Sequence, residues 1–253
     1  MPASYDNYDY PGYWKDRSYE HKSEILAVRN LLEKIPYIGT LADIGGGFGR
    51  LVNAYRHRVK KVYLIDPSAR LLAKAKKDLV AIHKIVYLQS SLEKILEKDI
   101  PTKFDVVVMV RVLHHITDID NAFEVLSKII VKNGYLIMEF ANKNHWKAVL
   151  TNFLHGNFTF PLDIFSIDRR STRSKKKNTI AFLNHHPDII SNKLQQKGFV
   201  VIDKLSVSNL RTGFLKKLLP QESLLNLEKK LQKPLAKVNF GPSIFILAKK
   251  VSY

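Results

Sequence analysis

Three glycines at alternate positions, Gly45, Gly47 and Gly49, carry the clearest chemical signal in this sequence. Glycine lets a backbone turn sharply and approach a ligand closely, and a helix that begins after such a turn presents free N–H groups. Asp66 comes 17 residues after Gly49, at the expected end of the next strand. A carboxylate at that place can accept hydrogen bonds from both hydroxyls of a ribose. Together these residues predict an adenosine-type ligand bound over the carboxyl ends of the strands.

The spacing of the loop distinguishes between two adenosine ligands. The dinucleotide pattern G-x-G-x-x-G requires a glycine where this chain has Arg50. Asp43, two residues before the loop, is poorly placed beside a pyrophosphate but suits the sulfonium and ammonium groups of S-adenosylmethionine (SAM). The sequence therefore favours SAM. The alternative is an ordinary strand-to-helix turn in an α/β protein that binds no ligand.

At these residues the chain resembles the class I SAM-dependent methyltransferases that act on small molecules (methyltransferase type 11-like). The resemblance runs from about Leu41 to Phe140 and from Pro187 to Lys250. It implies SAM as the methyl donor and assigns these contacts to it: the loop with Asp43, Gly45, Gly46, Gly47 and Gly49, the ribose acid Asp66, the adenine turn Ser90, Ser91 and Leu92, and Arg111 near the methionine part. The family often has Asp at the position of Ser91.

Two adjacent histidines, His114 and His115, follow the fourth expected strand and are candidates for catalysis. Methyl transfer can proceed by proximity and orientation alone, and it needs a general base only when the acceptor must lose a proton. A neutral imidazole is the usual base near neutral pH. The alternative is that one histidine caps the next helix. His185 and His186 have no accompanying carboxylate cluster, so we expect a structural role for them and no metal.

An aromatic-rich segment from Tyr5 to Tyr19 precedes the first expected helix. Aromatic faces attract cations, and a sulfonium is a cation. In related small-molecule enzymes a leading segment often folds over the site, so we expect residues 1–38 to form a lid and helix. Trp14 and Arg17, together with Tyr13 and Tyr19, are candidates to cover the donor and hold its carboxylate. The alternative is an N-terminal helix that only docks on the sheet.

Short β-branched runs alternate with helical segments and must position these motifs. The expected strands are 40–44, 61–66, 85–89, 104–110, 135–140, 198–207 and 243–250, and the expected helices are 50–57, 69–80, 118–131, 187–197 and 222–231. The alternation predicts an α/β fold with a doubly wound, mostly parallel sheet. The resemblance implies a Rossmann-like sheet of seven strands with helices on both faces. Its last strand should be antiparallel, between the fifth and sixth.

The composition limits the class of protein. The chain has 253 residues, 45% of them hydrophobic, and no cysteine. Disulfides, thiolate metal sites and cysteine nucleophiles are therefore excluded. No apolar run approaches the roughly 20 residues of a membrane span, and the N-terminus does not resemble a signal peptide. We expect one methyltransferase domain over residues 1–253, in the cytoplasm and without a transmembrane segment.

The net charge of +18 is concentrated in the C-terminal part. Residues 144–253 carry 19 Lys or Arg against 6 Asp or Glu, and residues 169–177 hold six basic side chains in nine positions. Such a balance favours an acidic partner, although a lysine-rich surface also simply keeps a protein soluble. By resemblance, the basic segments 144–180 and 208–241 should shape the acceptor pocket.

Three hypotheses for the function stay open at this point. In the first, the acceptor is a small or lipid-linked molecule, and the basic segments bind its anionic group or make peripheral contact with a membrane. In the second, the chain is an RNA methyltransferase. In the third, it is a non-catalytic SAM-binding protein.

Overall fold

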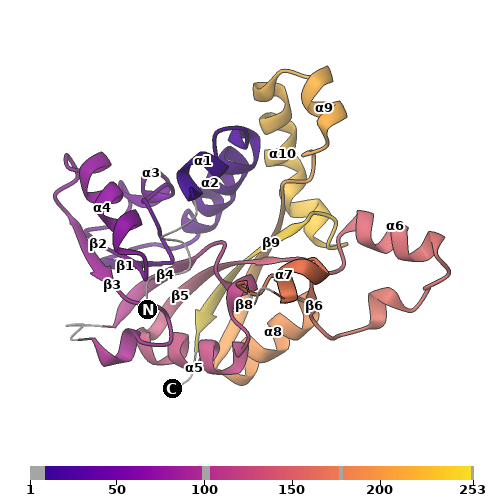
Figure 1. Ribbon diagram of the computed structural model, residues 1–253. Coiled ribbons are helices and arrows are strands. Elements are labelled where there is room, and N and C mark those ends of the chain that lie inside the picture. Colours follow the sequence, from indigo (N-terminus) through magenta and orange to yellow (C-terminus); the bar gives the residue numbers. More distant parts are fainter. Residues whose placement is uncertain (1–8, 99–102, 177–178, 252–253) are drawn as a thin grey trace.

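The computed structural model describes residues 9–98, 103–176 and 179–251, and its centre is a seven-stranded mixed sheet (Figure 1). The strands are β1 (Thr40–Ile44), β2 (Lys61–Asp66), β3 (Ile85–Gln89), β4 (Phe104–Met109), β5 (Ile130–Ala141), β8 (Phe199–Val207) and β9 (Ser243–Lys250). Their order is β3-β2-β1-β4-β5-β9-β8. Strands β1 to β5 pair in parallel, and β9 is antiparallel to both β5 and β8. The predicted α/β sheet with an antiparallel last strand is confirmed.

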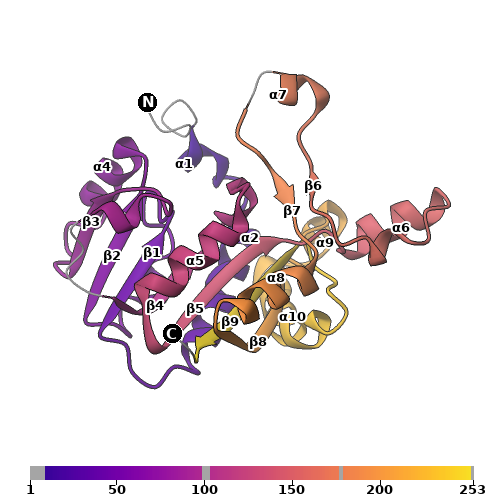
Figure 2. The same ribbon diagram turned by 90° about the horizontal axis from the view of Figure 1, so that it is seen from below.

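Helices cover both faces of this sheet (Figures 1 and 2). One face packs against α2 (Ser18–Leu32), α3 (Val52–Tyr55), α4 (Ala69–Asp78) and α10 (Gln221–Ala236), and the other against α5 (Ile119–Ile129) and α8 (Pro187–Gln196). Alternate residues of one strand enter different cores, as Leu41 and Ala42 do. The central strands read as unbroken apolar runs because both of their faces are buried.

Three elements differ by several residues from the bounds expected. Strand β5 begins at Ile130 and not at 135, so it takes up the end of the helix expected over 118–131. Helix α3 contains only Val52–Tyr55 of the expected 50–57, because tight turns from Gly46 to Leu51 still form the loop there. Helix α10 extends well beyond the expected 222–231. Its buried residues lie four apart, so packing continues to its end; they are Leu224, Glu228, Gln232 and Ala236.

The segments after β5 and β8 contain short elements that the sequence analysis did not predict. Helix α6 (Trp146–Leu154) and the 3-10 turn η3 (Phe160–Leu162) form an arm that projects from the body (Figure 2). Strands β6 (Ile167–Asp168) and β7 (Leu183–Asn184) pair antiparallel and carry α7 (Thr172–Lys176) between them. The other short elements are α1 (Tyr10–Tyr13), η1 (Ile95–Glu97), η2 (Leu113–His115) and α9 (Gly213–Leu218).

Some expectations fall on residues that the structure does not describe. Tyr5 and Tyr8 of the aromatic segment, and Lys177 of the basic stretch, lie outside the described residues. Across 9–98, 103–176 and 179–251, no helix is both long and apolar enough to span a bilayer.

Candidate active site

The glycine loop lies against the end of β2. The N–H groups of Gly45 and Gly46 donate to the carbonyl oxygen of Ile65 at 2.8 and 3.1 Å, and Gly47 N–H donates to Asp66 Oδ2 at 2.9 Å. Gly45 has φ +69°, and a Cβ there would lie 2.3 Å from Val112 Cγ2. Any side chain at this position would therefore collide with the segment after β4. The loop requires glycine where β1 and β4 meet.

A cavity of about 320 Å³ lies at the carboxyl ends of β1, β2 and β4. Its wall includes Tyr10, Gly45, Asp66, Ser90, Ser91, Leu92, Arg111 and His115. Asp66 is buried, and its Oδ1 also accepts a bond from Ser68 N–H at 2.8 Å. After β1 the chain continues to β2 on one side, and after β4 it continues to β5 on the other side. This edge of the sheet is therefore a topological switch point, where open α/β sheets bind ligands. We call it the donor cavity.

Several predicted donor contacts lie outside this wall. Gly46, Gly47 and Gly49 belong to the loop but do not line the donor cavity, and Asp43 is buried beneath it. Tyr55 donates its hydroxyl hydrogen bond to Asp43 Oδ2 at 2.7 Å. Burial raises the pKa of Asp43 to about 7, although this bond and the nearby positive charge of Arg50 oppose the shift. Asp43 therefore lies inside the protein beneath the glycine loop and does not line the donor cavity.

The aromatic lid candidates are also absent from the wall of the donor cavity. Trp14 is buried, with the Arg50 guanidinium 3.9 Å from its ring centroid. Arg17 lies over the Tyr13 ring at 4.2 Å and is exposed. Tyr10, which the sequence analysis did not single out, is the aromatic residue on the donor cavity wall. The N-terminal segment thus reaches the cavity through Tyr10.

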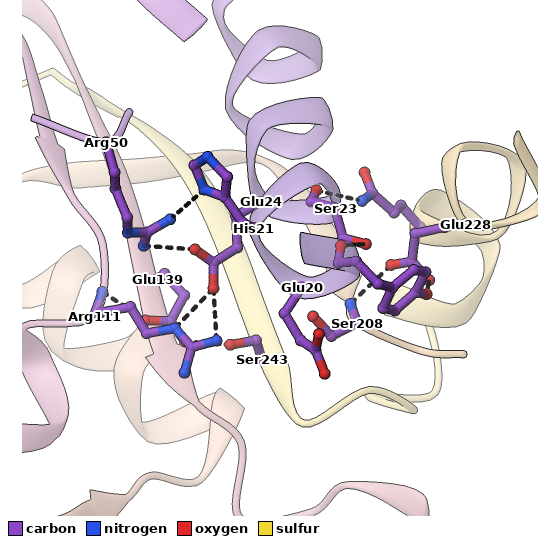
Figure 3. A network of polar contacts seen from close by, with 12 residues as sticks. Glu20, His21, Ser23, Glu24, Arg50, Arg111, Glu139, Ser208, Glu228 and Ser243 are labelled. Atoms are coloured by element: carbon purple, nitrogen blue, oxygen red, sulfur yellow. Dashed lines mark hydrogen bonds and ion pairs between the residues drawn. The ribbon is translucent and has the colours of Figure 1, made fainter. Parts of the chain in front are cut away.

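A buried carboxylate connects this segment to the loop (Figure 3). Glu24 of α2 accepts bonds from Arg111 Nε at 2.7 Å and Nη2 at 2.6 Å, and its other oxygen lies 2.6 Å from Arg50 Nη2. Burial alone would raise the pKa of Glu24, but the two guanidiniums outweigh it and lower the pKa. Glu24 is therefore ionised and holds both cations.

Arg111 is fixed from a second side as well. Its backbone has φ +64°, and its N–H donates to Glu139 Oε2 at 2.9 Å. Glu139 is buried in β5 and also accepts a bond from the Ser243 hydroxyl. Neither acid was expected from the sequence. A signal was present, because Glu24 precedes Ala27 and Val28 by three and four residues, on the apolar side of its helix, and Glu139 interrupts the apolar run 136–140.

The two candidate histidines face different spaces. His115 lines the donor cavity, and its Nδ1 lies 2.7 Å from the Ala181 carbonyl oxygen. His114 lines a second space of about 180 Å³. Burial lowers the pKa of His114 well below its usual value, and the neighbouring His115 and Arg111 lower it further. His114 is therefore a neutral imidazole at neutral pH.

The second space shares Arg111 with the donor cavity, and we call it the acceptor chamber for the role that we propose for it. The polar residues on its wall are Arg111, His114, Glu139, His145, Arg169, Asn184, Ser208, Arg211 and Ser243. His114 Nδ1, Asn184 Oδ1 and Ser208 Oγ are buried without a hydrogen-bond partner in the described part of the chain. An unpaired buried polar atom costs about 1–3 kcal/mol. All three belong to residues that line this space, and its wall is therefore polar.

The second histidine pair, His185 and His186, lies directly before helix α8. His186 caps α8, with Asp188 N–H donating to its Nδ1 at 3.2 Å, and its Nε2 lies 3.0 Å from the Pro161 carbonyl oxygen. His185 is buried beside it. Within the described ranges, no three His, Asp or Glu side chains are grouped so that they could hold a metal ion.

Comparisons with known proteins agree with this geometry. A family model described as a methyltransferase domain matches residues 42–138. The ubiquinone biosynthesis O-methyltransferase of Rhodopseudomonas palustris is 31% identical over 109 residues, which cover 43% of this chain and 42% of that protein. The chain thus matches less than half the length of this curated relative.

Two solved structures have the same fold. A SAM-dependent methyltransferase from Clostridium acetobutylicum aligns with a TM-score of 0.60 at 14% identity, covering 99% of this chain and 100% of the other. The N-methyltransferase NodS from Bradyrhizobium japonicum, in complex with S-adenosyl-L-homocysteine, aligns with a TM-score of 0.60 at 12% identity, covering 96% and 93%. At these identities the likeness concerns the fold alone.

Replacing Glu24 with Gln should destabilise the protein by about 3 kcal/mol, because it leaves two buried guanidiniums without their counter-charge. Urea unfolding followed by circular dichroism measures the change. Glu33→Gln is the matched control: this exposed acid at the end of the same helix has no ion pair within the described residues. Its effect should stay below about 0.5 kcal/mol. Equal unfolding free energies for the two variants would contradict the role of Glu24.

The raised pKa of Asp43 predicts a pH-dependent stability. Because the pKa of about 7 lies above the usual value of 3.8, the contribution of this group to stability is complete below about pH 4 and is lost as the pH rises through 7. Asp43→Asn cannot titrate, so between pH 4 and 8 its stability should rise relative to wild type, by up to about 4 kcal/mol. Urea unfolding at each pH measures this difference. The exposed Asp16→Asn should give a curve parallel to wild type, and a parallel curve for Asp43→Asn would contradict the prediction.

Proposed function

We propose that this chain, which carries a class I SAM-dependent methyltransferase domain at residues 42–138, transfers the methyl group of SAM to a small molecule held in the acceptor chamber. The observation that carries the proposal is the junction of two cavities at Arg111. One cavity has the glycine loop and a ribose-type carboxylate. The other has unpaired polar atoms around a neutral imidazole. A methyl donor and its acceptor require two such adjoining spaces.

The donor cavity fits SAM along its length. Asp66 lines this cavity at the end of β2 and would accept the ribose hydroxyls, as a carboxylate at that place does in dinucleotide folds. Ser90, Ser91 and Leu92 would contact the adenine. Glu24 binds Nε and Nη2 of Arg111, which leaves Nη1 for the carboxylate of the methionine part. The ring of Tyr10 would shield the sulfonium from water.

His114 is a better candidate than His115 for contact with the acceptor. His115 Nδ1 already bonds to Ala181, and the ring faces the donor, whereas His114 Nδ1 is buried and unpaired in the chamber. As the acceptor's lone pair forms a bond to the methyl carbon, the carbon–sulfur bond breaks and S-adenosylhomocysteine leaves. The neutral ring of His114 would hydrogen-bond to the acceptor and orient its lone pair toward the methyl carbon, and the acceptor's proton would pass to solvent, because the lowered pKa of His114 opposes its taking that proton.

The element that receives the methyl group can be oxygen or nitrogen in proteins similar to this one. The curated relatives are O-methyltransferases, and one structural neighbour is an N-methyltransferase. The sequence-based alternatives, an RNA acceptor and a non-catalytic SAM-binding role, are tested by the same assay. The protein is incubated with methyl-labelled SAM and with separate metabolite, lipid and RNA fractions. Label should enter the metabolite or lipid fraction. Label in RNA alone, or no transfer while SAM still binds, would contradict the proposal.

Asp66→Asn should weaken SAM binding about tenfold or more, because a charge-assisted bond to the ribose is lost. Isothermal titration calorimetry with SAM and with S-adenosylhomocysteine measures the affinity. Asp78→Asn, an exposed acid of α4, is the matched control and should bind as wild type does. Since Asp66 also supports the loop, a thermal melt without ligand must show that the variant is folded. Wild-type affinity in a folded Asp66→Asn protein would exclude this assignment.

His114→Ala should lower turnover about a hundredfold and leave SAM affinity within about twofold of wild type, as expected for a group that acts on the acceptor. Turnover is measured with the fraction that takes up label, and affinity by calorimetry. His115→Ala should instead weaken SAM binding, because His115 lines the donor cavity. The exposed His83→Ala serves as control. Unchanged turnover in the His114 variant would remove this residue from the reaction.

A further inference from the structure

Beyond the acceptor chamber lies an outer cavity of about 400 Å³. The two spaces share His145, Arg169 and Asn184, so the outer cavity adjoins the acceptor chamber, as the chamber adjoins the donor cavity at Arg111. The outer cavity is also lined by Lys143, Lys147, Thr151, Asn152 and Phe160, and none of its described lining residues is acidic. The far side of the acceptor chamber is therefore basic.

Two of the arginines around these spaces lack a carboxylate partner. Within 9–98, 103–176 and 179–251, neither Arg169 nor Arg211 forms an ion pair. Burial and then repulsion from Arg111 lower the pKa of Arg211, and the acid that opposes this, Glu20, is already bonded to Lys216 at 2.7 Å. These two guanidiniums are therefore cations without a fixed counter-charge.

Cationic side chains next to Arg169 and in the outer cavity, in contrast, are paired with acids. Arg170, the next residue after Arg169, is paired with Asp168 at 2.8 Å. Lys143 in the outer cavity is fully buried and lies 2.8 Å from Asp163. Arg170 and Lys143 thus each form an ion pair with an acid of their own. Arg169 and Arg211, both exposed, line the acceptor chamber without such a partner, whereas Arg111 on the same wall is paired with Glu24.

The backbone around the chamber holds these groups in place. Arg169 directly follows β6, and its N–H donates to the Phe182 carbonyl oxygen at 2.8 Å, next to the pairing of Ile167 with Asn184 of β7. His145 caps the nine-residue helix α6, and its Nδ1 accepts a bond from Ala148 N–H at 3.3 Å. The neutral ring therefore carries its proton on Nε2 and can donate from there.

We propose that the methyl acceptor carries an oxyanion, a phosphate ester or a carboxylate, which binds between Arg169, Arg211 and His145. The proposal rests on the proposed function, because it assigns a substrate class to the same chamber. Guanidinium groups bind such anions through charge-assisted, often bidentate bonds. The described acid on the chamber wall, Glu139, is held by Arg111 N–H and Ser243 at the donor side. The charges thus orient the acceptor, with its anion outward and its nucleophile toward His114.

The surroundings of His145 agree with this assignment. Burial lowers the pKa of His145 to about 4, and repulsion from Arg211 and Arg169 adds to the shift. A bound anion would offset that repulsion and raise the pKa of the imidazole. The histidine therefore reports directly on whether an anion is present.

The anion can belong to a free metabolite or to a lipid-linked molecule. The arm beside the outer cavity exposes large apolar side chains, namely Leu150, Phe153, Leu154, Phe158, Leu162, Ile164 and Phe165. An acyl or polyprenyl tail attached to the anion would find apolar surface there. The chemistry that the site recognises is the same in both cases, so the test must distinguish the sources.

The binding test compares two double variants with the same change in charge. Arg169→Gln/Arg211→Gln removes the unpaired arginines, and Arg173→Gln/Lys217→Gln removes exposed charges from α7 and α9, which line neither cavity. Inorganic phosphate and acetate are titrated by calorimetry, with NMR of the His145 ring. The first variant should bind the anion at least about tenfold more weakly, and the second within about twofold of wild type.

Each result of this test decides the proposal. Equal loss in both variants would indicate general charge attraction and overturn it, and so would wild-type protein that binds neither anion. SAM affinity is measured on the same samples and should not change in either variant. If the wild-type protein does not bind SAM, the proposed function is overturned, but the result of the anion titration still stands.

The transfer assay then identifies the source of the anion. Wild type receives methyl-labelled SAM with soluble metabolites divided on an anion-exchange column, or with vesicles made from extracted lipids. Label in the retained soluble fraction indicates a free metabolite, and label in the vesicles that moves with an anionic lipid indicates a lipid-linked one. Label confined to neutral or cationic molecules would overturn the proposal.

Discussion

The buried contact of Glu24 with Arg50 and Arg111 determines how the rest of the site is assembled (Figure 3). Arg50 ends the glycine loop after β1, and Arg111 follows β4, so one carboxylate connects both sides of the switch point. Charges withdrawn from water persist only when they are paired. Helix α2 must therefore stay at this edge of the sheet, and with it the segment that brings Tyr10 to the donor cavity.

The same helix carries a second buried network, which reaches the acceptor side. Tyr19 donates to Glu228 of α10 at 2.6 Å, and Glu228 accepts from the N–H groups of Ser208 and Asn209 at 2.8 and 3.1 Å. Ser208, with φ +62°, lines the acceptor chamber at the end of β8. Helix α2 thus holds both the glycine loop beside the donor cavity and the turn that lines the acceptor chamber. The two cavities are positioned by one element.

This arrangement explains which features the sequence could predict. Six of the seven strands of the main sheet agree within one residue with their expected bounds, since their apolar runs depend only on burial. The glycine loop and Asp66 could be predicted because a turn and the residue after a strand are local features. Glu24, Glu139 and Ser208 act through contacts between distant segments, which no local pattern encodes. The roles expected of Trp14 and Arg17 assumed that aromatic residues near a site face it, whereas Trp14 packs behind it against Arg50.

The positions of the charged side chains say more about the partner of this protein than its net charge does. Many basic residues of the C-terminal part are paired on the surface, as Lys193 is with Asp120 and Lys197 with Glu124. Such pairs contribute little to stability and do not identify a partner. Arg169 and Arg211 differ because they line a chamber beside the donor cavity. A net charge of +18 fits RNA, a membrane or a soluble surface equally well, whereas two cations on the wall of a 180 Å³ space favour a small anion. The volume of the chamber therefore limits the size of the anion that these two arginines can bind.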